Sequence, residues 1–195
     1  MTVKRFLKRR LVKLGLISGG LIGVFFPALT STAQTSPYPS QIVELSFTDA
    51  EGIGDPVGTV TLQDSEYGLI LTPSLMGLTP GLHGFHVHEN PDCGPADNEG
   101  ESVPGLAAGG HYDPEETGVH LGPYEDGHLG DLPPLYVDAE GNASTPVLAP
   151  RLTVATISDR SLMVHMNGDN FSDTPAPLGG GGARLACGVI ADQTL

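Results

Sequence analysis

The sequence predicts an all-β sandwich or barrel between residues 41 and 190. The stretches QIVELSF (41–47) and VGTVTLQD (57–64) alternate apolar and polar residues, which is the period of a half-buried strand. Turn-forming clusters separate such stretches, and no stretch after residue 33 predicts a helix longer than a turn or two. With 27 Gly, 17 Pro and no Trp, loops are expected to occupy much of this β framework.

Eight short strands are expected in order along the chain. They cover residues 41–47, 57–64, 67–73, 83–89, 135–137, 143–149, 161–165 and 184–190. Turn signals lie between the first four of these strands, at Asp55-Pro56, Asp64-Ser65-Glu66 and Thr79-Pro80-Gly81. Two long Gly-rich loops remain, at 90–131 and 166–183. A loop as long as 90–131 needs something to order it, and metal ions or a disulfide would do so.

Residues 1–33 have the layout of an export signal. Six cations precede an apolar run of 16 residues, 14–29, and a small-residue stretch ends at Ala33. Because the run is short for a membrane span, we expect cleavage after Ala33 and one mature domain over residues 34–195. The alternative is an uncleaved anchor.

Removal of this signal leaves a strongly acidic protein. All 23 acids lie after residue 33, but only three of the nine cations do, namely Arg151, Arg160 and Arg184. The formal charge of the mature part is therefore −20, compared with −14 for the whole chain. Such a surface repels nucleic acid and anionic lipid, so we expect neither as a partner, and no membrane attachment after signal removal.

The two cysteines, Cys93 and Cys187, are expected to form one disulfide, which is the default in an exported protein. The alternative is two free thiols.

Six of the seven histidines lie between residues 83 and 131, which indicates a metal centre. His86 and His88 are two apart on a predicted strand, so both side chains leave the same face and can share one ion. Alone, such a pair is more often exposed to solvent. His83, three residues before His86, faces the other way in a regular strand, and we interpret it as a buried structural histidine.

The remaining histidines favour two kinds of site. Three imidazoles and a carboxylate make a tetrahedral zinc shell, and the sequence supplies them as His111, His120, His128 and Asp131. A nitrogen-rich site favoured by copper would use His86, His88 and His165. If one histidine belongs to both sets, copper gains a fourth nitrogen.

Five motifs in this order resemble the Cu/Zn superoxide dismutases. They are GFHVHEN (84–90), GGHYDP (109–114), HLGD (128–131), SLMVH (161–165) and GGGGARLACGVI (179–190). The resemblance covers about residues 41–190, and the Cys93 loop with the PLGGGGARLACG ending is similar to the exported bacterial branch. It implies a Greek-key, eight-stranded flattened barrel or sandwich in which two long loops carry the function.

The resemblance also implies a role for each site residue. Copper would be bound by His86, His88, His111 and His165, and zinc by His111, His120, His128 and Asp131. His111 would then be a shared bridging imidazolate. Asp169 would orient one imidazole of each metal, Arg184 would guide the substrate, and the Cys93–Cys187 disulfide would help to position Arg184.

The activity implied is dismutation of superoxide to oxygen and hydrogen peroxide, with His111 leaving copper and taking up a proton in each cycle. Copper and zinc are the implied cofactors, and superoxide is the partner. A homodimer is compatible with the resemblance, and the periplasm is the expected compartment. There are two alternatives to an enzyme. One is an exported copper or zinc carrier, and the other is a structural domain of the same fold. A carrier would need neither Arg184 nor a shared His111, and a structural domain would be expected to lose ligands, yet none is missing.

Overall fold

A computed structural model describes residues 37–192 of the chain. The predicted export signal, residues 1–33, lies outside the described residues. Within 37–192, helical structure is limited to three single turns of 3-10 helix: η1 (Leu106–Ala108), η2 (Ala155–Ile157) and η3 (Leu178–Gly180). None of the helices in this part of the chain is long and apolar enough to cross a membrane.

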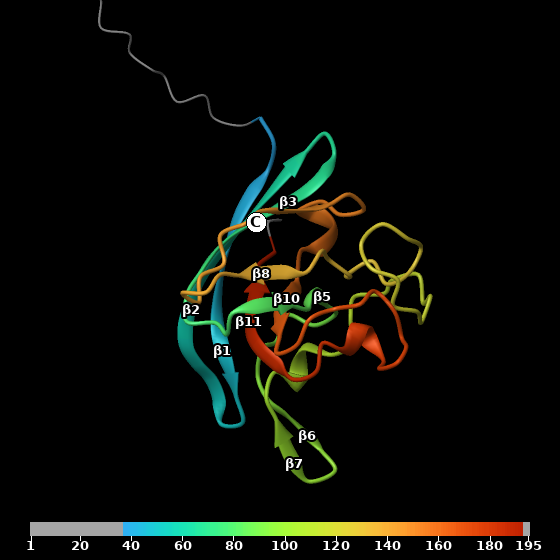
Figure 1. Ribbon diagram of the computed structural model, residues 1–195. Coiled ribbons are helices and arrows are strands. Elements are labelled where there is room, and N and C mark those ends of the chain that lie inside the picture. Colours follow the sequence, from blue (N-terminus) through green and yellow to red (C-terminus); the bar gives the residue numbers. More distant parts are fainter. Residues whose placement is uncertain (1–36, 193–195) are drawn as a thin grey trace, which may run out of the picture. The chain divides into compact units, whose positions relative to one another are not determined.

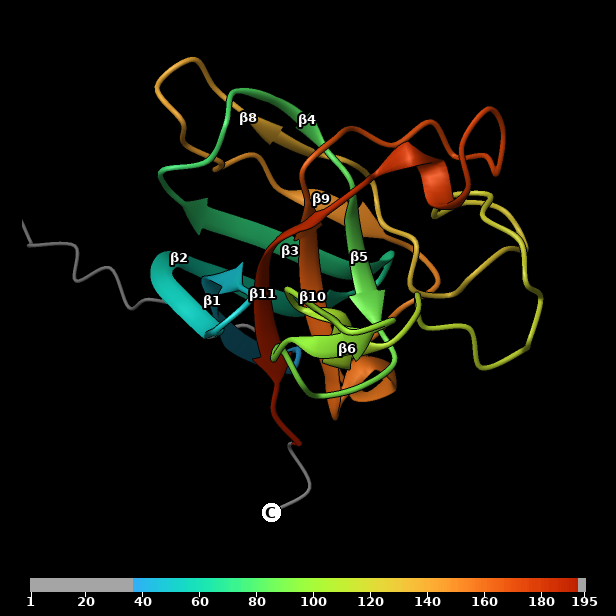
Figure 2. The same ribbon diagram turned by 90° about the horizontal axis from the view of Figure 1, so that it is seen from below.

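Seven strands form one antiparallel sheet in the order β5-β10-β11-β1-β2-β3-β9 (Figures 1 and 2). Their bounds are β1 Ser40–Asp49, β2 Gly52–Ser65, β3 Gly68–Leu75, β5 Phe85–His88, β9 Val147–Ala149, β10 Arg160–His165 and β11 Arg184–Ile190. The strands β1, β2 and β3 follow one another in sequence, whereas β11 returns to lie beside β1, and β9 returns to β3. These returns are the crossovers of a Greek key.

A separate sheet of two strands lies next to this sheet along the chain. The strand β4 (Gly81–His83) pairs with β8 (Leu135–Val137), and only Gly84 separates β4 from β5 (Figure 2). If β4 and β5 are counted as one strand broken at Gly84, the total is eight strands. This strand, the other six strands of the large sheet and β8 are the eight strands of the predicted barrel. The all-β prediction is therefore confirmed.

The core follows from the alternation seen in the sequence. In β1, residues 41, 43 and 45 are buried while 40, 42 and 44 are exposed, and β3 continues the pattern with 69, 71, 73 and 75 buried. In β2 the buried residues are 57, 60 and 62, so the alternation is broken between 57 and 60. Apolar side chains from all of the main strands fill the interior, among them Leu45, Leu62, Leu71, Phe85, Leu135, Leu162 and Ile190. This packed interior fixes β5 and β10, which carry the first histidines.

The turn predicted at Asp55-Pro56 is wrong, because both residues lie inside β2. The chain turns instead at Ala50 and Glu51, between β1 and β2. Proline lacks the N–H that a strand donates, but the register between β1 and β2 shifts on both sides of the Ser46–Pro56 pair. This irregularity accommodates the proline within the strand.

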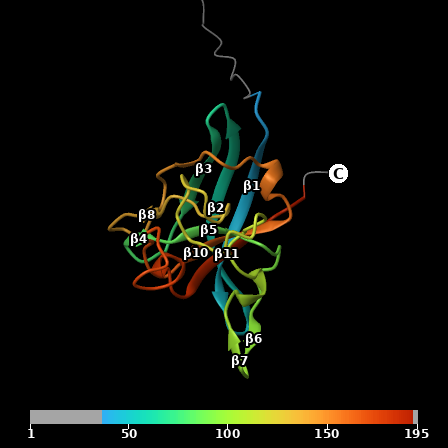
Figure 3. The same ribbon diagram turned by 90° about the vertical axis from the view of Figure 1, so that its right-hand side faces the viewer.

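The long loop at 90–131 contains a hairpin that the sequence does not predict. It consists of β6 (Ala96–Asn98) and β7 (Glu101–Val103), and it projects from the barrel (Figures 1 and 3). Two other boundaries differ from expectation. The predicted strand 83–89 is broken at Gly84, and the strand predicted over 143–149 is limited to β9, which begins directly after Pro146.

Candidate metal centre

The strands β5 and β10 bring three histidines together. His86 and His88 lie on β5, and His165 is the last residue of the neighbouring β10. All three side chains are buried. The spacing of His86 and His88 therefore places both rings on one side of the strand, as predicted.

Two loop segments then lie along β5 and add the remaining groups. The Val87 amide donates to Gly130 O, and the Tyr112 amide donates to Val87 O, both at 2.8 Å. Single antiparallel bridges pair His88 with His111 and His86 with Asp131. The loop side chains thus reach the cluster because their backbones are held against this strand.

Each of the three strand histidines has one ring nitrogen held by an outer acceptor. The carboxylate of Asp169 accepts from His86 Nε2 at 2.7 Å, and Gly109 O accepts from His88 Nδ1 at 2.9 Å. The His165 Nδ1 donates to Gly182 O at 3.1 Å. Because these nitrogens carry the ring protons, the opposite nitrogens present lone pairs to the centre of the cluster.

His111 lies between two groups of ligating atoms. One group, with atoms within 4.8 Å of one another, comprises His86, His88, His111 and His165. This is the predicted copper set. A second group of the same compactness comprises His86, His111, His120 and Asp131.

The second group differs from the predicted zinc set by containing His86 in place of His128. His128 nevertheless lies close by, with its Nδ1 3.4 Å from Asp131 Oδ1. The same carboxylate accepts from His111 Nδ1 at 2.9 Å, and its other oxygen lies 2.9 Å from His120 Nδ1. Three Nδ1 atoms therefore surround one carboxylate, which is the donor set that suits zinc.

Asp169 connects the two halves of the cluster. Its carboxylate accepts from His86 of the predicted copper set and, at 2.8 Å, from His120 Nε2 of the predicted zinc set. Gly179 lies directly against this carboxylate at φ +70°, where a Cβ would overlap Asp169 Oδ1 and come 2.7 Å from His120 Nε2. Glycine is required at this position by both the backbone angle and the space.

Burial and charge set the protonation of the metal-free cluster. Burial lowers the pKa of His86 to about 3 and of His165 to about 4, with His111 contributing to both shifts. For His120, burial is outweighed by the adjacent carboxylates of Asp131 and Asp169, which raise its pKa to about 9. The same contacts hold the pKa of both carboxyl groups below their usual range despite burial.

The donor set fits two metal ions. Among the described residues, two buried ring nitrogens of the cluster, His86 Nδ1 and His111 Nε2, have no hydrogen-bond partner. The buried His120 Nδ1 and His128 Nδ1 face Asp131 at 2.9 and 3.4 Å without the geometry of a hydrogen bond. Buried polar atoms left without partners are costly, and such atoms converging in one place indicate a bound cation. Imidazole nitrogens suit copper, and the three histidines around Asp131 suit zinc.

Arg184 begins β11 and lies beside this cluster. Its guanidinium donates to Gly105 O at 2.6 Å and to Gly109 O at 2.5 Å. The second of these carbonyls also accepts from His88. The Cys93–Cys187 disulfide, with a Cα–Cα distance of 5.6 Å, links the loop before these carbonyls to β11. The predicted disulfide is confirmed, and it joins the two segments that hold Arg184.

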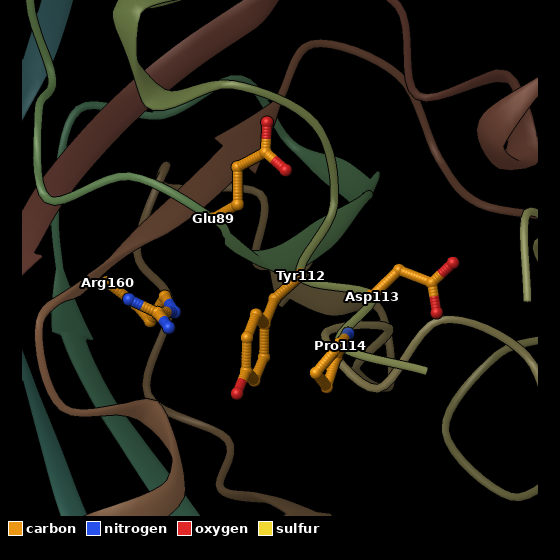
Figure 4. Close-up of a pocket in the computed structure, with 5 residues that line it drawn as sticks. All are labelled: Glu89, Tyr112, Asp113, Pro114 and Arg160. Carbon is orange, nitrogen blue, oxygen red and sulfur yellow. The ribbon is translucent and has the colours of Figure 1, made fainter. Parts of the chain in front are cut away.

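Two hollows flank these elements. One, of about 150 Å³, is lined by Arg184 with Val103, Pro104, Gly182 and Ala183. The other, of about 210 Å³, is lined by Glu89, Tyr112, Asp113, Pro114 and Arg160 (Figure 4). Glu89 and Tyr112 directly follow His88 and His111, so neighbouring side chains serve different surfaces. The second hollow is therefore separate from the metal cluster.

Three further side chains, His83, Asp173 and Arg151, make hydrogen bonds to main-chain atoms around the site. His83 is buried, with its ring nitrogens 2.7 Å from His165 O and Thr79 O, which confirms the structural interpretation. Asp173 accepts from the backbone amide of His120 at 2.9 Å. Arg151 donates to the backbone around His128. The sequence does not single out Asp173 or Arg151, because bonds to main-chain atoms leave no motif.

The comparisons with known proteins agree with this geometry. A family model described as copper/zinc superoxide dismutase matches residues 57–190. The chain belongs to the Cu/Zn superoxide dismutase family. A superoxide dismutase [Cu-Zn] 1 of Salmonella typhimurium is 55% identical over 150 residues, which are 76% of this chain and 85% of the relative.

Solved structures of the family have the same fold. The Cu/Zn superoxide dismutase from Brucella abortus superposes with a TM-score of 0.77 at 55% identity, covering 78% of this chain and 99% of that one. The monomeric copper, zinc superoxide dismutase from Salmonella enterica gives a TM-score of 0.71 at 51% identity, covering 77% and 99%.

The protein is accordingly an oxidoreductase of the Cu/Zn superoxide dismutase type, and its cofactors are copper and zinc. Superoxide is the substrate of this family. The disulfide and the bacterial relatives indicate a protein outside the cytoplasm. The Salmonella enterica relative is described as monomeric, and for this chain a homodimer stays a prediction.

Proposed function

We propose that this chain dismutes superoxide at a copper ion that shares His111 with a structural zinc ion. Copper would be held by His86, His88, His111 and His165, and zinc by His111, His120, His128 and Asp131. The observation that carries the proposal is the position of His111. Its Nδ1 lies 2.9 Å from Asp131, its Nε2 is buried without a partner, and its ring belongs to both groups of ligating atoms.

The two ions would supply different chemistry. Copper when bound provides a one-electron couple that can accept and return an electron, whereas zinc has no accessible redox change and supports the structure. In total, two superoxide anions and two protons give one dioxygen and one hydrogen peroxide. The protein must therefore bind an anion and deliver protons.

Arg184 is the group that would bind and orient the anion. Its guanidinium is half-buried and fixed by the carbonyls of Gly105 and Gly109, so its remaining N–H groups point in a set direction. Burial lowers its pKa, yet an arginine stays protonated at neutral pH. Gly182 lines the Arg184 hollow and accepts from His165, which makes this hollow the approach to the predicted copper set.

His111 would deliver a proton. Its Nε2 lies among the predicted copper ligands, while Asp131 holds its Nδ1 side. A ring fixed at one nitrogen can exchange a proton at the other without reorienting. Asp169 would keep the neighbouring rings of His86 and His120 aligned throughout this exchange.

The proposed site of action is the periplasm, after removal of residues 1–33. The amino-terminal sequence supports export, and the disulfide supports an oxidising compartment. Cell fractionation together with amino-terminal sequencing of the mature protein tests this part. Recovery of the intact chain from the cytoplasm would contradict it.

The enzymatic part is tested with purified residues 34–195 loaded with copper and zinc. We expect fast dismutation that cyanide inhibits, because an open copper position binds that anion. Arg184→Ala should retain both metals but lose turnover by about ten-fold or more, the range of electrostatic guidance, while Arg160→Ala should not. Full metal occupancy without turnover would favour a metal carrier.

A further inference from the structure

Arg151 holds a short segment of the loop that carries His128. It follows Pro150, just after β9, and its guanidinium donates to three main-chain carbonyls. The bonds run from Nη1 to Glu125 O at 2.6 Å and to His128 O at 3.3 Å, and from Nη2 to Gly127 O at 3.0 Å. One side chain therefore gathers three carbonyls from the four residues 125–128.

Apart from Arg151, few bonds hold this segment. Residues 113–130 form no strand or helix. The His128 amide donates to Val119 O at 3.0 Å, and His128 O accepts from the Asp131 amide at 3.4 Å. Converging carbonyl oxygens repel one another unless a donor lies between them. The planar guanidinium, with five N–H groups in fixed directions, can satisfy several carbonyls at once, which a single ammonium cannot do.

The geometry connects Arg151 to the zinc half alone. Segment 125–128 ends at His128 and leads within three residues to Asp131, and both belong to the predicted zinc set. None of the four predicted copper ligands lies in this segment. His88 and His165 are held instead by the carbonyls of Gly109 and Gly182.

The other two arginines of the mature chain make different contacts. Arg184 is bound to Gly105 and Gly109 near the copper set. The Arg160 guanidinium carbon lies 4.7 Å from the centre of the Tyr112 ring, and its Nη1 bonds to the adjacent Asp159 O (Figure 4). Arg160 therefore provides a matched control for the loss of one positive charge.

We propose that Arg151 is a positioning residue for the zinc half of the metal centre. It keeps segment 125–128 in place before metal arrives, so that His128 need not be ordered when zinc binds, while Asp131 is already held by its bridge to His86 on β5. Pre-organisation of this kind raises affinity by removing an ordering cost. This inference rests on the proposed zinc ligands.

The test compares Arg151→Met, which keeps a long apolar stem without donors, with Arg151→Lys and Arg160→Met. Zinc affinity is measured on the purified protein by competition with a chromophoric chelator, and copper affinity is measured separately. We expect Arg151→Met to weaken zinc binding by about 10- to 100-fold, the usual effect of an outer-shell change, with copper binding unchanged. Arg151→Lys should recover part of the loss, and Arg160→Met should bind zinc as the unmodified protein does.

If Arg151→Met leaves the zinc affinity unchanged, this inference is overturned and the proposed function stays intact. Equal weakening of zinc and copper would also overturn it, since that result indicates general destabilisation. Failure of the unmodified protein to bind zinc would overturn both proposals together. If Arg151→Met does not fold, Arg151→Lys carries the test, because a lysine that binds zinc as tightly as arginine contradicts the need for three gathered carbonyls.

Discussion

The Nε2 atoms of His88 and His165 lie 3.3 Å apart, and the other nitrogen of each ring donates to a main-chain carbonyl. Both facing nitrogens therefore present lone pairs to each other. Burial holds the pKa of both histidines below the ordinary value, so neither readily takes a proton to relieve the contact. A cation bound by the two lone pairs resolves this arrangement.

Replacing one of these rings should therefore remove copper selectively. We expect His165→Gln to weaken copper binding by more than about 100-fold, beyond the range seen for outer-shell changes, while zinc is retained. The reciprocal variant, His128→Gln, should lose zinc and keep copper. Metal analysis after dialysis against a competing chelator measures both. Loss of both metals from each variant would contradict two separable half-sites.

Asp169 supplies a second prediction, because one carboxylate aligns a histidine of each half. In Asp169→Asn the amide keeps one acceptor, so one of the two ring N–H groups faces a competing donor. Both copper and zinc affinities should fall, by about 10- to 100-fold. Asp55→Asn, which removes the same charge from an exposed position on β2, is the control. Unchanged affinity for either metal would contradict the proposed shared role.

Much of this site follows from the sequence, and the limit has a physical cause. Strand alternation places His86 and His88 on one side of β5. His83 lies apart from them on β4, across the break at Gly84. The positions of His111 and Asp131 depend on loop backbones that hydrogen-bond to β5, which no local pattern encodes. Their inclusion in the predicted site came from the family resemblance and from ligand chemistry.

The features that the sequence analysis predicts wrongly or misses also depend on tertiary contacts. Pro56 lies within β2 because a register shift opposite it removes the need for its missing N–H, whereas the dipeptide alone favours a turn. From the sequence, Arg151 is only one of three cations in an acidic mature chain. Its bonds go to carbonyls that every residue possesses, so the side chain pattern of the sequence gives no sign of them.

The protonation of His120 makes zinc binding sensitive to pH. Its pKa is raised to about 9 because Asp131 and Asp169 contact its two nitrogens, so the metal-free ring carries a proton at pH 7. Zinc must displace that proton from Nδ1, and its affinity should therefore increase as the pH rises toward 9. The zinc-free protein conversely loses the stabilising contribution of this proton as the pH rises from 6.5 through about 9.

Calorimetry at pH 7 in buffers of different ionisation enthalpy counts the protons released when zinc binds. We expect about one proton from this ring per zinc ion. In Asp169→Asn the pKa of His120 should be lower, so the released fraction should decrease. Zinc binding without proton release at pH 7 would contradict the raised pKa.

The charge of the loop at residues 166–183 bears on the rate at which superoxide arrives. The loop contains no Lys or Arg, and its acids, Asp169 and Asp173, are engaged with His120. Arg184 and the metal ions must therefore attract an anion against a formal charge of −20, from three cations and 23 acids after residue 33. We expect association to be slower than in relatives that carry lysines in this loop.

Salt provides the measurement, because ions screen attraction and repulsion alike. Little or no decrease in kcat/KM is expected between about 0.01 and 0.15 M salt, where the screening length falls from about 30 to 8 Å. Thr174→Lys places a cation at an exposed position of the same loop and should raise kcat/KM at low salt only, whereas the uncharged Thr174→Gln should not. A steep decrease with salt in the unmodified protein would mean that net attraction survives its acidic surface.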